Sequence, residues 1–142
     1  MSTRQFGATW WGQAWIAALE ERAAVDPTRL PRGRTYARQD RVGRLELAPG
    51  KVTALVRGQR ALPYRVTVTV PTARAGALDD LAAAIARRAA SAAALLDHEL
   101  DPVLVEDATA LDVALLPGTG ELKTRCSCPD WADPCKHAAA VC

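Results

Sequence analysis

The amino-acid sequence predicts an α+β fold: a three-stranded antiparallel sheet packed with two helices, followed by a small zinc knuckle at the carboxyl end. Residues 64–70 alternate apolar and polar side chains, as a strand with one buried face does. Residues 75–96 have an apolar stripe at helical spacing. All four cysteines lie within the last 17 of the 142 residues. We therefore divide the chain into an α+β region over 1–109 and a metal-binding segment over 110–142.

The first predicted helix spans residues 10–24. One of its faces collects side chains at a 3.6-residue period: Trp11, Trp15, Ala18, Leu19 and Arg22. Thr9 is suited to the N-cap, and Asp26-Pro27 ends the helix. Trp10 cannot share that face, so it packs elsewhere or stays exposed. We expect its large ring to anchor the core, with stacking on a nucleic-acid base as the alternative.

Turn formers mark residues 28–40, including Pro31 and Gly33, and predict a loop there. Two strands follow, over about 42–47 and 51–57. The intervening Pro49-Gly50 suits a type II turn. The third strand spans 64–70, and the short connections make the sheet antiparallel.

The second predicted helix occupies roughly residues 75–96. Its apolar stripe consists of Leu78, Leu81, Ile85, Ala89, Ala92 and Leu96. Asp79 and Asp80 lie near its amino-terminal end, where the helix dipole favours negative charge. Residues 97–120 are ambiguous and suit a short helical turn near 103–108 and an apolar segment over 111–116.

The carboxyl-terminal segment has metal-ligand spacing. Its donors are Cys126-x-Cys128 and, six residues later, Cys135-x-His137. Residues two apart on an extended segment point to the same side, so the first two thiolates can bind one ion. Three thiolates and one imidazole are typical of a closed, structural Zn²⁺ site. Residues 136–141 are predicted to be helical.

Charge and spacing favour zinc over the other chemistries of this segment. Zn²⁺ with three thiolates has a net charge of −1, which the neighbouring cations offset: Lys123, Arg125 and Lys136. Two alternatives remain open: a redox pair of Cys135 with Cys142, and a nucleophile–base pair of Cys135 with His137. Cys142 is most simply a small buried side chain on the last helix. Asp130 and Asp133 lie in the loop, outside ligand spacing.

The segment CSCPDWADPCKHAAAV resembles a SWIM-type zinc finger, which has the pattern C-x-C, a variable gap and C-x-H. Upstream, TWWGQAW, LPRGRTYAR and LPYRVTV resemble the amino-terminal region of bacterial SWIM zinc finger proteins. The resemblance implies one structural Zn²⁺ bound by Cys126, Cys128, Cys135 and His137. It also implies a nucleic-acid or protein interaction role, often alongside Snf-type helicase-like ATPases. That family usually continues beyond the ligand helix, so we expect this chain, which stops at Cys142, to be a truncated one.

Basic residues concentrate in the amino-terminal half. Residues 1–74 have 13 basic and 5 acidic side chains, whereas residues 75–142 have 5 and 11. The candidate nucleic-acid-binding side chains lie in one run: Arg29, Arg32, Arg34, Tyr36, Arg38 and Arg41. Guanidinium groups bind phosphate and stack on flat rings, so this run can follow a nucleic-acid backbone. The alternative is a solvated loop whose arginines pair with the acidic carboxyl-terminal half.

Composition argues against several other classes. The chain has no apolar run long enough to cross a bilayer and no secretory signal at its start, which predicts a soluble protein of the reducing cytoplasm, without a membrane partner. It lacks a phosphate-cradling glycine loop, a Ser-His-Asp set and recognisably spaced acid–base carboxylates. We therefore expect neither enzymatic activity nor a small-molecule substrate.

The predicted function is a non-enzymatic, zinc-binding adaptor of the SWIM type that engages DNA or RNA with little sequence preference and acts with a Snf-type helicase-like ATPase. The alternative is a protein–protein interaction module, in which Trp131 and the last helix contact a partner around a purely structural zinc. We also expect chelation to unfold residues 121–142 and to leave the amino-terminal sheet intact.

Overall fold

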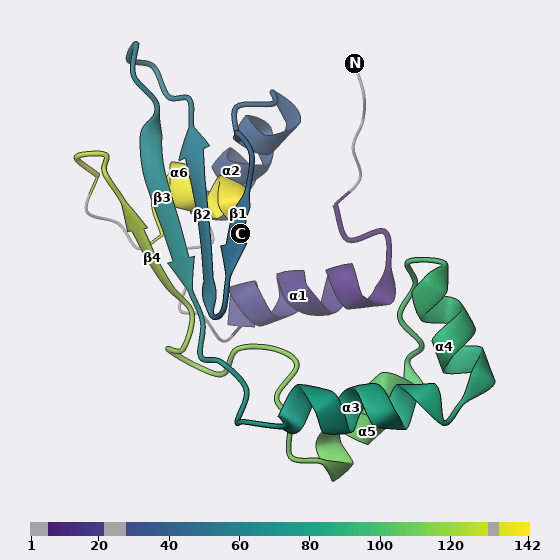
Figure 1. Cartoon of the computed structure of the whole chain (residues 1–142). Coiled ribbons are helices and arrows are strands. Elements are labelled where there is room, and N and C mark those ends of the chain that lie inside the picture. Colours follow the sequence, from purple (N-terminus) through teal and green to yellow (C-terminus); the bar gives the residue numbers. More distant parts are fainter. Residues whose placement is uncertain (1–5, 22–27, 131–133) are drawn as a thin grey trace.

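The computed structural model describes residues 6–21, 28–130 and 134–142. These residues form six helices and one four-stranded sheet, which confirms the α+β class (Figure 1). In chain order the elements are α1 (Trp10–Glu21), α2 (Arg29–Arg38), β1 (Glu46–Ala48), β2 (Lys51–Val56), β3 (Tyr64–Thr69), α3 (Ala77–Ala86), α4 (Ala89–Leu96), α5 (Val103–Ala110), β4 (Lys123–Cys126) and α6 (Lys136–Val141).

The sheet is antiparallel throughout, in the order β1-β2-β3-β4. The prediction of three strands was wrong, because the metal-binding segment supplies a fourth: β4 pairs with β3, with Val66 opposite Cys126. The first strand is also shorter and later than the predicted 42–47. It spans Glu46–Ala48, and Val42 forms an isolated bridge with Val56.

Helix α1 begins where the sequence predicts. The Thr9 side-chain oxygen accepts a hydrogen bond from the Gly12 N–H at 3.1 Å, which satisfies a free donor at the helix start. Ala18 and Leu19 are buried, but Trp11 is 40% exposed, so the predicted apolar face is only partly used. Trp10 packs elsewhere and donates its indole N–H to the Leu100 carbonyl at 2.7 Å. Arg22 and the predicted helix end at Asp26-Pro27 lie outside the described residues.

Residues 28–40, predicted as a loop, contain helix α2, so that prediction was wrong. Pro31 lies in the first turn, where a missing N–H breaks no helical hydrogen bond. Gly33 is buried because α6 approaches it closely: a Cβ there would lie 2.6 Å from the Ala139 carbonyl carbon. The glycine that signals a turn in the sequence thus serves helix packing.

The Ala-rich stretch over 75–96, predicted as one helix, is two. Helices α3 and α4 are separated at Arg87 and Arg88, and Arg88 has extended backbone angles, φ −113° and ψ 112°. The Arg88 guanidinium pairs with Asp107 on α5. The predicted helix near 103–108 is confirmed as α5. The apolar segment predicted over 111–116 has no helix or strand, and its Val113 is buried in the core beside α5.

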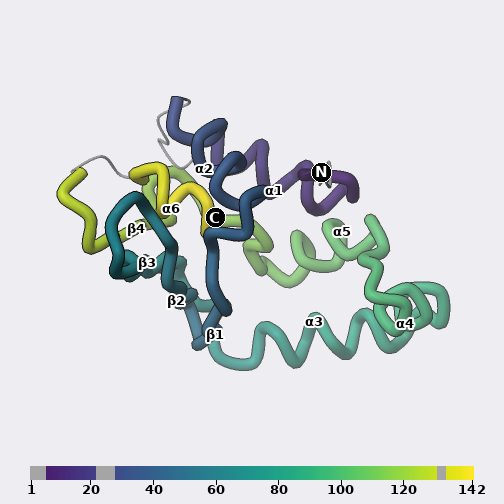
Figure 2. Tube along the Cα trace, turned by 90° about the horizontal axis from the view of Figure 1, so that it is seen from above, coloured from purple at the N-terminus to yellow at the C-terminus, as the bar shows by residue number. Residues whose placement is uncertain are grey.

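The described residues form two main hydrophobic cores. The larger lies between the sheet, α1 and α6, and consists of Leu19, Val56, Val66, Val68, Leu122, Cys135 and Ala138. The smaller holds α3 and α5 together and consists of Ala77, Leu81, Leu104, Ala108 and Val113. Seen from above, α6 lies between the sheet and α2, and α3–α5 lie to one side (Figure 2).

The larger core contains residues from both sides of position 109, so the predicted segments 1–109 and 110–142 fold against each other. Their status as separate domains stays a prediction. In the described parts of the chain, no helix has the length and apolar character needed to cross a membrane.

Candidate metal centre

The end of β4 and the start of α6 position the four predicted ligands. Cys126 is the last residue of β4, and Cys128 follows in the adjoining turn. Ser127, between them, is fixed by two hydrogen bonds to Arg65: its N–H donates to the Arg65 carbonyl at 3.0 Å, and its hydroxyl accepts from the Arg65 N–H at 2.9 Å. The pairing with β3 therefore continues past Cys126 and holds the C-x-C segment in place.

The second pair of ligands belongs to α6. Cys135 is the N-cap, and its sulfur accepts a hydrogen bond from the Ala138 N–H at 3.4 Å. His137 lies in the first turn. A thiolate at a helix N-terminus is stabilised by the free N–H groups and the helix dipole. The short last helix thus orients two ligands and stabilises the charge of one.

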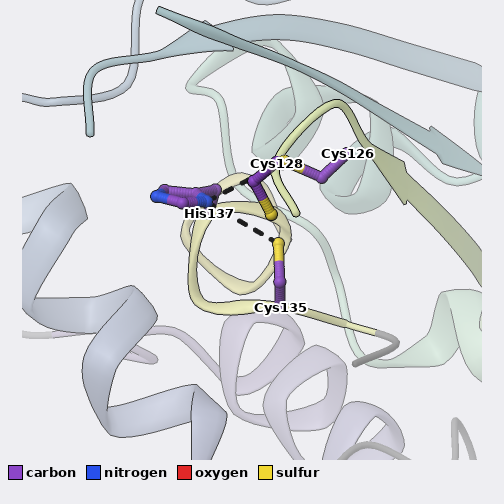
Figure 3. A group of neighbouring side chains, drawn as sticks. All are labelled: Cys126, Cys128, Cys135 and His137. Atoms are coloured by element: carbon purple, nitrogen blue, oxygen red, sulfur yellow. Dashed lines mark hydrogen bonds between the residues drawn. The ribbon is translucent and has the colours of Figure 1, made fainter. Parts of the chain in front are cut away.

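The four side chains converge on one point (Figure 3). Their ligand atoms all lie within 4.8 Å of one another, and Nδ1 of His137 is 3.8 Å from the sulfurs of both Cys126 and Cys135. Tetrahedral zinc with Zn–S bonds of ~2.3 Å and Zn–N bonds of ~2.0–2.1 Å needs donor atoms about 3.5–3.8 Å apart. The donor set and its spacing therefore fit a single tetrahedral Zn²⁺.

Burial favours the neutral forms of the ligands before a metal binds. Desolvation raises the pKa of Cys126 to about 12 and raises the pKa of Cys135 as well. Desolvation, together with the nearby Lys136, lowers the pKa of His137, and this outweighs the opposing effect of Asp130. A neutral imidazole can bind zinc directly, whereas these thiols must first release their protons.

Two tyrosines enclose the ligand ring of His137. Tyr36 on α2 stacks on it at an interplanar angle of 14°, with ring centroids 5.4 Å apart. Tyr64 on β3 lies on it at a 34° tilt, with centroids 4.5 Å apart. Gly58 completes the wall, since a Cβ there would lie 2.5 Å from the Tyr64 ring and 3.2 Å from Nε2 of His137. The alternation along β3 predicts that Tyr64 lies on the buried face of the sheet, but no sequence pattern predicts its contact with His137.

The predicted nucleic-acid-binding residues lie on or just after α2. Arg29 forms an ion pair with Asp130 at 2.8 Å, as the alternative interpretation of pairing with the carboxyl-terminal half expects. Arg34 pairs with Glu20 at 3.3 Å. Arg38 lies over the ring of Phe6. Their binding to nucleic acid stays a prediction.

The two remaining arginines of the run differ from these. Arg32 is exposed and has no ion pair within the described residues. The Arg41 guanidinium lies over the Tyr36 ring, 4.9 Å from its centroid, on the ring that stacks against His137. Tyr36, predicted to contact nucleic acid, thus also supports the metal ligand.

The fourth cysteine has a different setting. Cys142 ends α6 and is partly buried, in line with the prediction of a small side chain packed on the last helix. Its carbonyl oxygen accepts a hydrogen bond from the Trp15 indole at 2.7 Å, which ties α6 to α1. Trp131 and Asp133, considered in the sequence, lie outside the described residues.

Comparison with known proteins identifies the metal-binding segment. Residues 105–142 match the family model of the SWIM zinc finger. The chain is 45% identical over 135 residues to Uncharacterized protein Rv2102 of Mycobacterium tuberculosis, and the alignment covers 94% of this chain and 48% of that protein. The chain therefore spans about half the length of this curated relative. No solved structure matches it. The family match and the cysteine–histidine cluster together assign one structural Zn²⁺ to the site.

Proposed function

Because the chain contains a SWIM zinc finger, we propose that it is a non-enzymatic adaptor that binds DNA or RNA through its arginine-rich helix and acts with a Snf-type helicase-like ATPase. One observation supports the nucleic-acid role above the others: the arginine-rich helix α2 packs directly against the zinc-ligand helix α6. Gly33 contacts Ala139, and Tyr36 stacks on His137. The basic helix therefore packs directly on the helix that carries two of the metal ligands.

Helix α2 has an arginine that is well placed to bind the phosphate backbone of a nucleic acid. Arg32 is exposed, and within the described residues no carboxylate pairs with it. Such a side chain can bind a phosphate without first breaking an ion pair. Binding through phosphates is insensitive to sequence and weakens steeply with salt, because each contact displaces condensed counterions.

Oligonucleotide binding tests this proposal directly. We expect fluorescence anisotropy with short labelled DNA and RNA to give binding at ~50 mM salt that falls by at least tenfold at ~200 mM. Arg32→Ala with Arg34→Ala is expected to weaken binding and to lower the slope of log K against log salt by about one to two. Absent or salt-independent binding by the wild-type chain would contradict the proposal.

A matched variant controls for the loss of two charges. Arg74 has a surface ion pair with Asp80 at 3.5 Å, much as Arg34 has with Glu20, and Arg87 is exposed like Arg32. Arg74→Ala with Arg87→Ala therefore removes the same charge from the region of α3. This pair is expected to change oligonucleotide binding less than twofold. An equal loss in both double variants would point to net charge alone.

A second candidate function, a protein–protein interaction module, is favoured by a different surface. β1 is an edge strand, and large apolar side chains around it are exposed: Leu45 at 47%, Leu47 at 77% and Leu55 at 51%. Exposed leucines next to an unpaired strand edge suit a protein partner. Under this alternative, Leu47→Glu weakens capture of a purified Snf-type ATPase, whereas Arg32→Ala with Arg34→Ala leaves capture unchanged.

The proposal that the chain is not an enzyme is supported by the closed donor set. Three thiolates and one imidazole fill the four positions of tetrahedral zinc and leave none for a substrate or water. Substitution with Co²⁺ tests this point. The absorption spectrum is expected to indicate four protein ligands in tetrahedral geometry, and a spectrum of a five-coordinate ion would contradict it.

A further inference from the structure

A polar pocket of about 380 Å³ lies beside the metal centre, and the sequence did not point to it. It is lined by Gln39, Arg41, Arg57, Gly58, Arg60 and Ala61. Three of these six residues are arginines, and none is acidic. Arg41 follows α2, whereas Arg57 and Arg60 lie in the connection from β2 to β3. The fold thus brings together cations from two separate parts of the chain.

Neutral oxygen atoms hold the three guanidinium groups in place. Arg41 donates to Oε1 of Gln39 at 2.7 Å and, at longer distances, to the carbonyls of Arg57 and Gly58. Arg57 donates to the carbonyl of Asp40 at 2.9 Å. Arg60 donates to the carbonyl of Leu62 at 3.3 Å. These bonds fix the positions of the cations without neutralising them.

Other arginines of the chain show how this pocket differs. Among the residues that the structure describes, four lie against a carboxylate: Arg29 with Asp130, Arg34 with Glu20, Arg74 with Asp80 and Arg88 with Asp107. Within the described residues, none of the three pocket arginines has such a partner. Like charges held close together repel, so the pocket as built favours an anion that takes hydrogen bonds from several guanidinium groups.

Aromatic side chains of the metal centre contact two of the pocket arginines. Arg41 lies over the Tyr36 ring at 4.9 Å, and Arg60 lies over the Tyr64 ring at 4.2 Å. The same two tyrosines enclose the zinc ligand His137. The side chains therefore form a continuous stack, from Arg41 through Tyr36, His137 and Tyr64 to Arg60. The ring of His137 thus lies between the two tyrosines on which two of the pocket arginines rest.

We propose that the pocket formed by Arg41, Arg57 and Arg60 is a phosphate-binding site. The guanidinium fork matches the oxygen atoms of a phosphate, and three forks around one cavity supply more donors than a single exposed arginine does. In the cell, the phosphate that occupies this site belongs to the backbone of the bound nucleic acid. This identification of the occupant rests on the proposed function, whereas the phosphate site itself does not.

Inorganic pyrophosphate is the probe for the site itself. Calorimetric titration of the zinc-loaded chain is expected to give saturable binding that Arg57→Ala with Arg60→Ala weakens at least tenfold. The control Arg74→Ala with Arg87→Ala is expected to change it less than twofold. Absence of pyrophosphate binding at millimolar concentration, or equal losses in the two double variants, overturns the proposal.

A second pair of variants leaves every arginine in place. Ala61 is exposed and lines the pocket. Ala61→Glu places a carboxylate among the guanidinium groups and is expected to weaken pyrophosphate binding at least tenfold. Ala61→Gln introduces a side chain of the same shape as glutamate but without the charge, and it is expected to change binding less than threefold. Equal binding by the two variants contradicts an anion site. All four variants should retain one zinc per chain, which shows that the metal centre has folded.

Oligonucleotide titrations with the same variants separate the pocket from the proposed function. If Ala61→Glu weakens both pyrophosphate and oligonucleotide binding, the backbone phosphate is supported as the occupant. If only Arg32→Ala with Arg34→Ala weakens oligonucleotide binding, the backbone assignment is overturned and the proposed function stands. If pyrophosphate binds in the pocket but no oligonucleotide binds the wild-type chain, the proposed function fails and the phosphate site stands.

Discussion

The imidazole ring of His137 lies nearly parallel to the phenol ring of Tyr36, at an interplanar angle of 14° and with centroids 5.4 Å apart. One ring belongs to the zinc-ligand helix α6 and the other to the arginine-rich helix α2. This stack joins the metal centre to the basic surface. Disturbing either ring is therefore expected to affect the other.

Replacing Tyr36 tests this connection. Tyr36→Ala removes the stack and is expected to cost about 1 kcal/mol, or roughly fivefold in zinc affinity, because aromatic pairs contribute ~0.5–1.5 kcal/mol beyond their buried area. Competition with a coloured chelator measures the affinity. Tyr36→Phe keeps the ring and is expected to keep the wild-type value. Similar affinities for the alanine and phenylalanine variants would show that the stack contributes nothing.

Gly33 gives a prediction in which two effects oppose each other. In a helix, Gly→Ala gains about 0.5–1 kcal/mol from backbone preference. At Gly33, however, the new Cβ would lie 2.6 Å from the Ala139 carbonyl carbon and 2.8 Å from the Ala140 nitrogen. Because backbone atoms must shift, overpacking of ~1–3 kcal/mol outweighs the gain. We expect Gly33→Ala to lower the free energy of unfolding by about 1–2 kcal/mol in urea denaturation.

A control on the same helix separates packing from backbone preference. Thr35 is exposed, so Thr35→Ala is expected to change stability by less than ~0.5 kcal/mol. If Gly33→Ala proved more stable than the wild-type chain, α6 would not approach α2 as closely as the structure places it.

Removing zinc is expected to affect more than the last 22 residues, which revises the expectation from the sequence. β4 pairs with β3, and Cys135 and Ala138 lie in the larger core, so losing the metal removes an edge strand and part of that core together. Zinc binding contributes ~10–16 kcal/mol in small finger peptides, more than the total stability of most domains. Hydrogen exchange after chelation should show loss of protection in β3 and β4.

The helices α3 and α5 provide the internal control for that experiment. Their core is separate, with Leu81, Leu104 and Ala108 buried away from the metal. Their amide protection is expected to outlast chelation. Loss of protection in α6 alone, with β3 unchanged, would mean that the sheet is stable without its fourth strand.

Zinc affinity is expected to rise with pH. Desolvation raises the pKa of Cys126 to about 12 and also raises the pKa of Cys135, so both thiols are protonated near neutral pH in the metal-free fold. Metal binding requires both thiolates and therefore releases at least two protons, whereas His137, with its lowered pKa, is already neutral. Between pH 6.5 and 7.5, roughly, the apparent affinity should therefore increase by at least about 100-fold.

Calorimetry in two buffers with different ionisation enthalpies counts the released protons. Cys126→Ser is the informative variant, because a serine hydroxyl is not ionised at these pH values and has no thiol proton to lose. It should release about one proton fewer than the wild-type chain and bind zinc more weakly. A pH-independent affinity would mean that the thiols are already ionised before zinc binds.

The sequence predicted those elements whose signals are local. Alternation predicted β3, the Thr9 cap predicted the start of α1, and the C-x-C and C-x-H spacings predicted which side chains converge. Helix α2 was missed because Pro31 and Gly33 are turn formers in most settings. What makes Gly33 favourable in a helix is the backbone of Ala139, more than 100 residues away.

The remaining errors have the same origin in distant contacts. β4 has the sequence Lys-Thr-Arg-Cys, whose single apolar side chain gives no alternation, and its strand conformation comes from pairing with β3. Nothing in the Ala-rich stretch indicates the break at Arg88, which pairs with Asp107 on another helix. The pocket around Arg57 and Arg60 also depends on the approach of Arg41 from a different part of the chain.

The pairing of Val66 with Cys126 has a consequence for how the protein is made on the ribosome. The amino-terminal part of the larger core leaves the exit tunnel well before the rest, because Leu122, Cys135 and Ala138 lie far later in the sequence than Leu19, Val56, Val66 and Val68. Until they emerge, Val66 and Val68 on the nascent chain lack their final neighbours and remain open to unwanted association. The helices α3–α5, whose contacts are closer in sequence, can form during that interval.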